Sequence, residues 1–261
     1  MTVPRIVYAG DRDISVWVLE YLLQRGIRPL ALFISHPKRA SHAHVLRSLC
    51  ADLPSEHILV GKAFREPKGL TLLRSLDIDL IIAVHFPYIF PPEVLQIPKV
   101  GVLNLHPAYL PYNRGWHTPS WAILEDTPAG ATLHFMDEGI DTGDIIHQKR
   151  ISIKPSDTAH TLYQRIKRAE LEVFKEAWPS IEKGTIIRHS QDPKDGTTHK
   201  RNDLEKVQKL NLEESMPIGD LLKRLRALTT NRIEEAAYFE VNGRRYRIQV
   251  SIFEEKHASG N

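Results

Sequence analysis

Asn104, His106 and Asp141 are residue types that together serve chemistry at a carbonyl carbon. Asn104 and His106 lie two positions apart at the end of an apolar run, so both side chains point to the same face of a strand. An asparagine amide donates to an oxygen that gains negative charge, and an imidazole exchanges protons near neutral pH. Asp141 follows between Gly139 and Gly143, which let the backbone turn tightly and aim a carboxylate at the imidazole. The three side chains form a set suited to acyl transfer.

The elements that must position this set follow from the hydrophobic pattern. Apolar runs alternating with helical periodicity predict an α/β fold, a Rossmann-like and mostly parallel sheet with helices on both faces. Strands are expected at residues 5–10, 29–35, 59–60, 79–85, 100–105, 131–136 and 145–153. A long amphipathic helix is expected over residues 158–183, with Gly184 as its left-handed cap. The strand ending near His106 then opens on the crevice that parallel sheets form at their carboxyl edge.

Composition limits the other possibilities. The chain has 261 residues, of which 42% are hydrophobic and 26% charged, as in a globular protein with one sizeable core and an appendage. The net charge of +3 is too small to indicate a nucleic-acid surface. No apolar run is long enough for a membrane span and no signal peptide is recognisable, so we expect a cytoplasmic protein without membrane contact.

The single cysteine, Cys50, suits a reducing compartment. The histidines His36, His42 and His44 lack carboxylate or thiol partners, so no metal is expected.

Each member of the reactive set also has a structural explanation when it is taken alone. Asn104 suits the turn after a strand, His106 precedes Pro107 as a structural histidine, and Asp141 is a common turn residue. The flanking sequence decides between these interpretations. Residues 104–115 read NLHPAYLPYNRG and residues 137–144 read DEGIDTGD. Together these motifs resemble the formyltransferases that use N10-formyltetrahydrofolate, and the resemblance extends over roughly residues 5–190.

This resemblance implies a set of roles for particular residues. Asn104, His106 and Asp141 match the catalytic trio of the family, and N10-formyltetrahydrofolate would be the cosubstrate. The family holds the pterin ring mainly through backbone groups of two loops. The matching positions are Tyr88, Ile89 and Phe90 in one loop and Asp137, Glu138, Gly139 and Ile140 in the other. The apolar composition of residues 86–92 suits a flat heteroaromatic ring, although packing under the next helix would also explain it.

The stretch from residue 110 to 121, LPYNRGWHTPSW, is the expected acceptor loop. Arg114 stands beside a helix that Thr118 could cap, which suits a diphosphate. Alternatively, Arg114 is only solvated and the tryptophans belong partly to the core. Arg12, close to a helix N-terminus, is either a phosphate contact or a solvated loop arginine. The candidate substrate-binding residues are Arg12, Tyr112, Asn113, Arg114, Trp116 and His117.

The C-terminal part distinguishes members of the family. We expect a catalytic domain at residues 1–190 and a small module at 191–261, with helices over 203–210 and 217–228. A hairpin is expected at 236–241 and 244–252, with its turn at Asn242-Gly243. From residue 191 onward, 13 Lys and Arg face 12 Asp and Glu. A tRNA-binding extension would carry a clear positive excess, and glycinamide ribonucleotide enzymes end near the long helix.

Such a tail resembles that of the nucleotide-sugar N-formyltransferases, where it helps to pair two subunits. The resemblance implies a homodimer that formylates a dTDP- or GDP-linked 3- or 4-amino-dideoxy sugar for surface polysaccharide synthesis. Asn104 and a protonated His106 would stabilise the oxyanion, while Asp141 would orient His106 and help to remove the amine proton. The alternatives are a methionyl-tRNA or glycinamide ribonucleotide formyltransferase, or a non-catalytic protein that binds a nucleotide sugar.

Overall fold

A mixed seven-stranded sheet forms the centre of the protein in the computed structural model, which describes residues 3–192 and 194–255. The tips of both expected domains, residues 1–2 and 256–261, lie outside the described residues, as does Pro193. The strands are β1 (Ile6–Gly10), β2 (Ala31–Ile34), β3 (Ile58–Val60), β4 (Leu80–Val84), β5 (Gly101–His106), β7 (Ala129–Phe135) and β8 (Ile145–Ile151). Their order in the sheet is β3-β2-β1-β4-β5-β7-β8.

Strand direction determines where the reactive residues meet. Strands β1 to β5 are parallel to one another, whereas β7 is antiparallel to both of its neighbours, β5 and β8. The predicted α/β class with a mostly parallel sheet is therefore confirmed. The reversed strand β7 lies beside the carboxyl half of β5, where it pairs His134 with Asn104 and Thr132 with His106.

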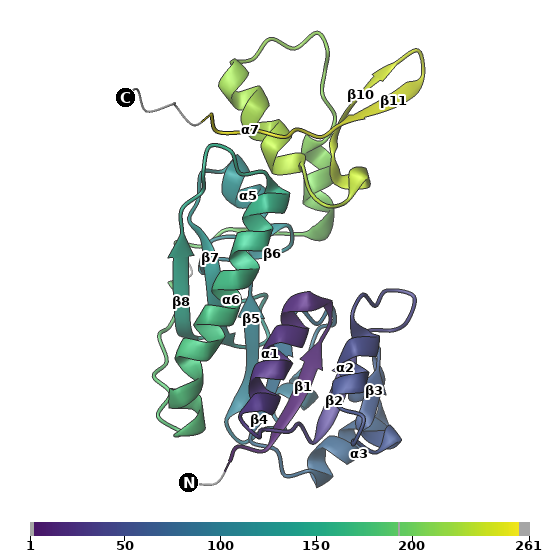
Figure 1. The fold of residues 1–261 in the computed structure, drawn as a ribbon, viewed down its shortest axis with the longest axis vertical. Helices are drawn as coiled ribbons and strands as arrows, with labels where there is room; N and C mark the ends of the chain where they lie inside the picture. Colours follow the sequence, from purple (N-terminus) through teal and green to yellow (C-terminus); the bar gives the residue numbers. More distant parts are fainter. Residues whose placement is uncertain (1–2, 193, 256–261) are drawn as a thin grey trace, which may run out of the picture.

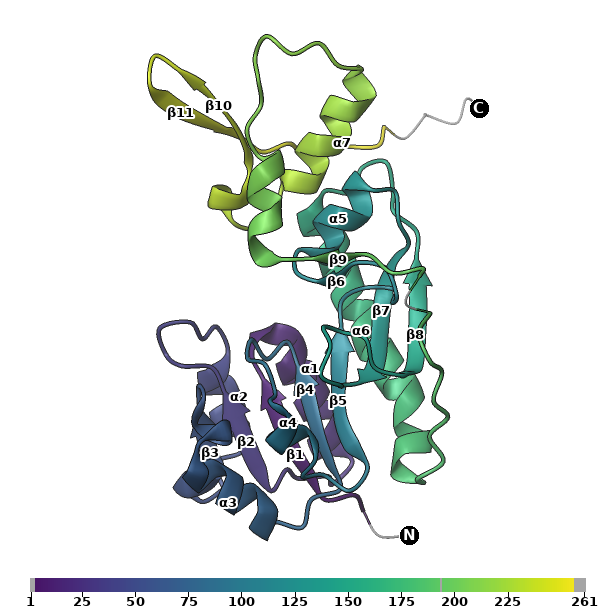
Figure 2. The same cartoon turned by 180° about the vertical axis from the view of Figure 1, so that it is seen from behind.

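Helices cover both faces of this sheet, as predicted. Helices α1 (Arg12–Gln24), α2 (Ala43–Leu49) and α6 (Ala159–Glu182) lie on one face (Figure 1). Helices α3 (Pro67–Ser75) and α4 (Pro92–Leu95) lie on the other (Figure 2). Both faces need cover because successive side chains of β1 point to opposite faces of the sheet. Ile6 and Tyr8 enter one hydrophobic core, and Val7 and Ala9 enter the other.

The long helix α6 follows from local sequence signals. Thr158 caps its N-terminus by accepting from the Thr161 N–H at 3.3 Å, and the Thr161 hydroxyl accepts from the Thr158 N–H at 2.9 Å. Gly184 follows with φ +68°, so the predicted left-handed cap is present. Phe174 and Trp178 are fully buried against the sheet. Neither α6 nor any other helix in the described part of the chain is long and apolar enough to cross a membrane.

The C-terminal module rests on helix α5 (Thr118–Leu124), away from the main sheet (Figure 1). It contains α7 (Ile218–Leu228) and a hairpin of β10 (Ala237–Val241) and β11 (Arg244–Ile248). Its own small core contains Trp121, Leu204, Leu225, Leu228 and Ala237. Asn242 and Gly243 have φ values of +50° and +72°, which confirms the predicted hairpin turn.

Two boundaries in this module differ from the prediction. The expected helix over 203–210 is a 3₁₀ helix, Arg201–Val207, because residues 208–210 instead pair with the hairpin through Tyr238. The second hairpin strand ends at Ile248 rather than at residue 252. Ile248 pairs with Ala237, the first residue of β10, so no partner strand continues beyond it. Beyond the strand, the Val250 N–H donates to the Thr229 hydroxyl.

Candidate active site

Strand β5 brings Asn104 and His106 to the carboxyl edge of the sheet with both side chains on one face, as the spacing predicted. His106 is buried and Asn104 is half-buried. Asp141 reaches the same place from the loop between β7 and β8. One of its carboxylate oxygens, Oδ1, accepts from Asn104 Nδ2 at 3.2 Å. The other, Oδ2, lies 3.6 Å from His106 Nδ1. The three residues selected from the sequence therefore form one cluster.

The Asp141 loop is held in a conformation that few residues adopt. Asp141 itself has φ +53°, a left-handed value that costs energy for a residue other than glycine. Gly143 lies against the Phe135 carbonyl, and a Cβ atom at this position would collide with it. The Gly115 N–H, in the acceptor loop, donates to Asp141 Oδ2 at 2.9 Å and fixes the position of the carboxylate. The separation from His106 Nδ1 exceeds a hydrogen bond, so Asp141 acts on His106 mainly through its charge.

His134 is a fourth polar group in this cluster, and the sequence analysis did not select it. It stands opposite Asn104 in the β5–β7 pairing, and its Nε2 lies 3.2 Å from Asn104 Nδ2 and 3.5 Å from Asp141 Oδ1. Its Nδ1 lies 2.7 Å from the Phe135 carbonyl, which accepts only. In neutral His134, Nδ1 therefore carries the proton and Nε2 accepts from Asn104. A polar residue in an otherwise apolar strand was the only available signal, because the cross-strand register cannot be read from the sequence.

The electrostatics of the cluster favour a carboxylate beside a neutral imidazole. Burial alone would raise the pKa of Asp141, but His106, His134 and the Gly115 N–H outweigh it, so the pKa lies well below its ordinary value. Burial also lowers the pKa of His106, and the opposing effect of Asp141 is smaller. His106 is therefore neutral at pH 7. The protonated His106 expected to stabilise the oxyanion would therefore gain its proton during the reaction.

We expect His106 to titrate below its ordinary pKa, which is about 6.5 for an unperturbed histidine. A folded-state pKa below that value means that the imidazole stays neutral as the pH falls through 6.5 and gains its proton only at lower pH. Histidine-labelled protein followed by NMR from pH 4.5 to 8.5 would measure the midpoint, with the same residue in urea-unfolded protein as the control. A midpoint above that of the unfolded chain would contradict this arrangement.

The expected folate-binding residues lie in two loops, one after β4 and one between β7 and β8. Ile89 and Ile140 are 78% and 55% exposed, although both are large apolar side chains. Tyr88 is half-buried, and its hydroxyl accepts from the His36 N–H at 3.1 Å. Phe90 is 4% exposed and packs among Phe33, Phe64 and Phe86. Its side chain therefore belongs to the core, and only its backbone can contact a ligand.

Residues 137–140 form the second of these loops, and all four are exposed. Asp137 shapes the turn, because its Oδ1 accepts from the Gly139 N–H at 2.9 Å and from the Thr142 hydroxyl at 2.6 Å. The side chains of Asp137 and Thr142 are thus committed to the turn. The backbone of Glu138, Gly139 and Ile140 remains at the surface, next to the catalytic carboxylate in sequence.

Two predicted substrate contacts in the acceptor loop are directed into the protein. Arg114 is buried, and its Nε and Nη2 donate to Gln191 Oε1 at 3.1 and 2.8 Å. Asn113 is 1% exposed, and its Nδ2 donates to the Thr127 hydroxyl at 2.8 Å. Both side chains are therefore committed to internal partners, which argues against the diphosphate contact expected of Arg114. Thr118 is also not a helix cap, because its hydroxyl donates to the Pro107 carbonyl.

The other acceptor-side candidates remain accessible. Trp116 is 45% exposed, and the Arg201 guanidinium lies 5.2 Å from its ring centroid. Tyr112 and His117 are half-buried, and His117 Nδ1 lies 4.0 Å from Glu235 Oε2. These contacts join the acceptor loop to the C-terminal module.

Arg12 lies at the start of α1, and it is exposed. The buried carboxylate of Asp11 caps this helix by accepting from the Arg12 N–H at 2.9 Å. A carboxylate at this position disfavours a phosphate on the backbone amides. Any phosphate contact here would therefore be made by the Arg12 side chain alone.

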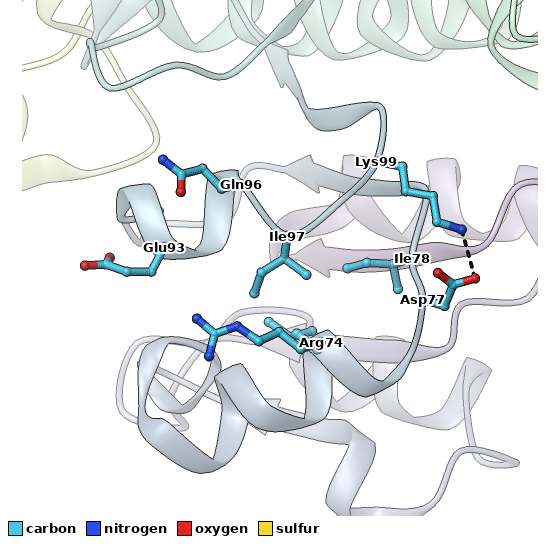
Figure 3. Close-up of a pocket in the computed structure, with 8 residues that line it drawn as sticks. Arg74, Asp77, Ile78, Glu93, Gln96, Ile97 and Lys99 are labelled. Carbon is cyan, nitrogen blue, oxygen red and sulfur yellow. Dashed lines mark hydrogen bonds and ion pairs between the residues drawn. The ribbon is translucent and has the colours of Figure 1, made fainter.

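A second imidazole and carboxylate meet in the protein interior, where His85 Nε2 lies 2.7 Å from Glu170 Oε1. A hollow of about 390 Å³ lies between α3, α4 and the segment that precedes β5 (Figure 3), and His106 does not line it. Arg74 and Lys99 both line it, and Lys99 is paired with Asp77 at 2.8 Å. Across residues 3–192 and 194–255, no group of three or more histidine, cysteine, aspartate or glutamate side chains is placed to hold a metal ion.

Comparison with known families identifies two matching regions. A family model described as formyl transferase matches residues 33–178. A second model, described as an N-formyltransferase dimerization C-terminal domain, matches residues 203–254. The chain is 32% identical over 228 residues to the dTDP-4-amino-4,6-dideoxyglucose formyltransferase of Mycobacterium tuberculosis, a match that covers 83% of this chain and 95% of the relative. It is 31% identical over 193 residues to the methionyl-tRNA formyltransferase of Geobacter metallireducens, covering 72% of this chain and 62% of the relative.

Solved structures share the fold over nearly the whole chain. A 4-N formyltransferase from Francisella tularensis superposes with a TM-score of 0.82 at 21% identity, covering 97% of this chain and 99% of the other. A sugar 3N-formyl transferase crystallised in the presence of dTDP and 5-N-formyl-tetrahydrofolate superposes with a TM-score of 0.69 at 21% identity, covering 91% and 85%. At these identities the likeness shows a common fold.

Proposed function

The chain belongs to the formyl transferase family, and we propose that it transfers a formyl group from N10-formyltetrahydrofolate to the amino group of a nucleotide-linked amino sugar. The observation that carries this proposal is the cluster of Asn104, His106 and Asp141 at the carboxyl end of β5. These groups match what formyl transfer to an amine requires, namely a donor for the oxyanion and a base for the amine proton.

The choice of a sugar acceptor is supported by the extent of the similarity. The relative that formylates dTDP-4-amino-4,6-dideoxyglucose is matched over 95% of its length, whereas the methionyl-tRNA formyltransferase is matched over 62%. The nearly neutral C-terminal module also lacks the positive excess that tRNA would favour. We therefore propose a dTDP- or GDP-linked 3- or 4-amino-dideoxy sugar, used for surface polysaccharide, as the acceptor.

The folate is proposed to bind between the loops at residues 88–90 and 137–140. The exposed Ile89 and Ile140 offer apolar contacts for a flat ring, and the backbone of the second loop offers hydrogen bonds to its edge. Tyr88 would support the first loop through its bond to the His36 N–H. A protein of the same fold was crystallised in the presence of 5-N-formyl-tetrahydrofolate, which supports a folate ligand.

The mechanism starts from the neutral state of His106. The amine can attack the formyl carbon only after it loses its extra proton, and the neutral imidazole of His106 can accept that proton. The Asp141 carboxylate lies 3.6 Å away and stabilises the imidazolium that results. The Asn104 amide donates to the oxygen of the formyl group as negative charge develops on it. In this scheme, His106 acquires its positive charge during the reaction. When the tetrahedral intermediate collapses, the bond between the formyl carbon and N10 of the folate breaks, and the His106 imidazolium gives its proton to N10 so that tetrahydrofolate leaves as a neutral amine. The attacking nitrogen releases its second proton to solvent, which leaves the neutral formamide.

A homodimer is also proposed, with the main domain at residues 1–190 and the pairing module at 191–261. The matching C-terminal family model is named for dimerization, which supports this assembly. Several large apolar side chains of the module are exposed. Among residues 194–255 they include Leu212, Ile218, Leu222, Ile233, Val241, Tyr246 and Phe253. An isolated two-stranded hairpin is marginally stable, so burial against a second copy would stabilise it.

Incubating the protein with N10-formyltetrahydrofolate and a panel of acceptors tests the function. The panel would contain dTDP-, UDP- and GDP-linked 3-amino and 4-amino sugars, together with methionyl-tRNA and glycinamide ribonucleotide. We expect a formylated nucleotide sugar, detected by mass spectrometry, and equal release of tetrahydrofolate. Formylation of methionyl-tRNA or glycinamide ribonucleotide alone would contradict the acceptor class. Binding of a nucleotide sugar without turnover would instead favour a non-catalytic binding protein.

A further inference from the structure

Gln191 links the catalytic loop to the acceptor loop through four hydrogen bonds. Its Nε2 donates to the carbonyl oxygens of Asp141 at 2.9 Å and Gly143 at 2.7 Å. Its Oε1 accepts from Nε and Nη2 of the buried Arg114. A glutamine side chain has two N–H donors and two acceptor lone pairs, so all of its hydrogen-bonding capacity is used here.

These bonds form a closed ring of contacts that includes the catalytic carboxylate. The Asp141 carbonyl accepts from Gln191, and Gln191 accepts from Arg114. Gly115, the next residue after Arg114, donates its N–H to Asp141 Oδ2 and closes the ring. Gln191, in the linker that joins the main domain to the C-terminal module, thus holds the backbone of Asp141, and Gly115 in the acceptor loop holds its carboxylate. Because Asp141 has a strained φ of +53°, its position depends on such external support.

The rest of the linker supports the acceptor loop in the same way. Strand β9 (Thr198–His199) pairs in parallel with β6 (Arg114–Gly115). The Arg114 N–H donates to the Thr197 carbonyl at 2.9 Å, and the Trp116 N–H donates to the His199 carbonyl at 3.0 Å. A Cβ atom on Gly115 would collide with the His199 carbonyl, so the two segments approach as closely as glycine permits.

We infer that Gln191 is a positioning residue for formyl transfer, and that the linker to the C-terminal module completes the active site. This inference rests on the proposed function, because it concerns the reaction at Asn104, His106 and Asp141. Gln191 acts through Asp141 rather than on the substrate. It holds the carboxylate at the distance from His106 at which the imidazolium is stabilised.

Gln191→Glu is the variant that isolates this role. The carboxylate retains an acceptor for the buried Arg114, but it turns an oxygen toward the Asp141 and Gly143 carbonyls in place of two donors. We expect kcat to fall about 10- to 100-fold with the KM for folate little changed, since displacing a catalytic group by about 1 Å costs on the order of 10²-fold. A folded Gln191→Glu protein, verified by circular dichroism, that keeps the parental kcat would overturn the inference.

Gln208→Glu provides the matched control. Gln208 is buried, whereas Gln191 is half-buried, and Gln208 Nε2 likewise donates to a backbone carbonyl, that of Glu234, at 3.2 Å. It lies in the C-terminal module and makes no hydrogen bond to the catalytic cluster in the described structure. The same chemical change there should leave kcat unchanged. An equal fall of kcat in both variants would show a general loss of folding and would count against a specific role for Gln191.

A second readout does not require turnover. In Gln191→Ala the Asp141 loop loses its two donors, so the carboxylate that raises the pKa of His106 should move away. The NMR titration midpoint of His106 should then fall below that of the parent. An unchanged midpoint would contradict the inference. If the parent formylates no acceptor in the panel, the proposed function fails, and this titration still decides whether Gln191 positions Asp141.

Discussion

Asp141→Asn should lower kcat for formyl transfer by on the order of 10³-fold or more, comparable to the loss when a catalytic aspartate beside a histidine is neutralised elsewhere. Asp141 is the carboxylate that contacts Asn104, His106 and His134. In the proposed reaction His106 becomes cationic while it is buried, and Asp141 supplies the opposing charge. The amide keeps the shape of the side chain but not its charge. The measurement is steady-state release of tetrahydrofolate with the accepted nucleotide sugar.

The variant also disturbs the hydrogen bonds of the carboxylate. Oδ2 accepts from the Gly115 N–H and Oδ1 accepts from Asn104 Nδ2, whereas an asparagine has only one oxygen. Asp157→Asn is a suitable control, because Asp157 is also buried and accepts from the Lys154 N–H and from Arg165, away from the catalytic cluster. That variant should lose stability but retain kcat at a temperature where it is folded. Parental kcat in Asp141→Asn would remove the carboxylate from the mechanism.

The sequence was most informative where a local signal determines the structure. The helix α6 was predicted from its apolar periodicity and from Gly184, and both are local features. The hairpin turn at Asn242-Gly243 was predicted for the same reason. The errors came from tertiary contacts. The helix expected over residues 203–210 ends early because residues 208–210 form backbone hydrogen bonds with Tyr238 in place of helical ones. No feature of the local sequence predicts that pairing.

The same distinction applies to the site. Asn104 and His106 were selected from a spacing of two and Asp141 from its glycine-bounded loop, and the structure brings these three residues together. His134 was missed because its place opposite Asn104 depends on the β5–β7 register. Arg114 was assigned to a diphosphate because it stands beside a helix start, whereas a partner 77 residues away, Gln191, holds it inside. Sequence spacing identifies groups on one strand but not contacts across the fold.

Asn104→Ala should reduce kcat by about 10²- to 10³-fold, or about 2.7–4 kcal/mol, the range for loss of one oxyanion donor. Asn104 Nδ2 has two N–H groups, and in the structure they lie 3.2 Å from His134 Nε2 and 3.2 Å from Asp141 Oδ1. To accept a hydrogen bond from Asn104 Nδ2, an oxyanion must therefore replace either His134 Nε2 or Asp141 Oδ1 as its partner. A ring nitrogen that accepts a hydrogen bond carries no charge, so His134 Nε2 is the weaker competitor, because hydrogen bonds to charged acceptors are roughly twice as strong. The amide can then donate to the oxyanion while it keeps its bond to Asp141.

The replacement of His134 by the oxyanion as the partner of Asn104 distinguishes transition-state stabilisation from substrate binding. The formyl oxygen is nearly neutral in the ground state and should not displace His134, so Asn104→Ala should lower kcat while the KM for folate changes little. The exposed Asn202 provides a control for the substitution itself, and Asn202→Ala should keep both parameters. A rise in KM at constant kcat would show that Asn104 binds the substrate and the transition state equally. In that case the oxyanion would depend on another donor, and the place of His134 beside Asn104 would make its imidazole the next group to test.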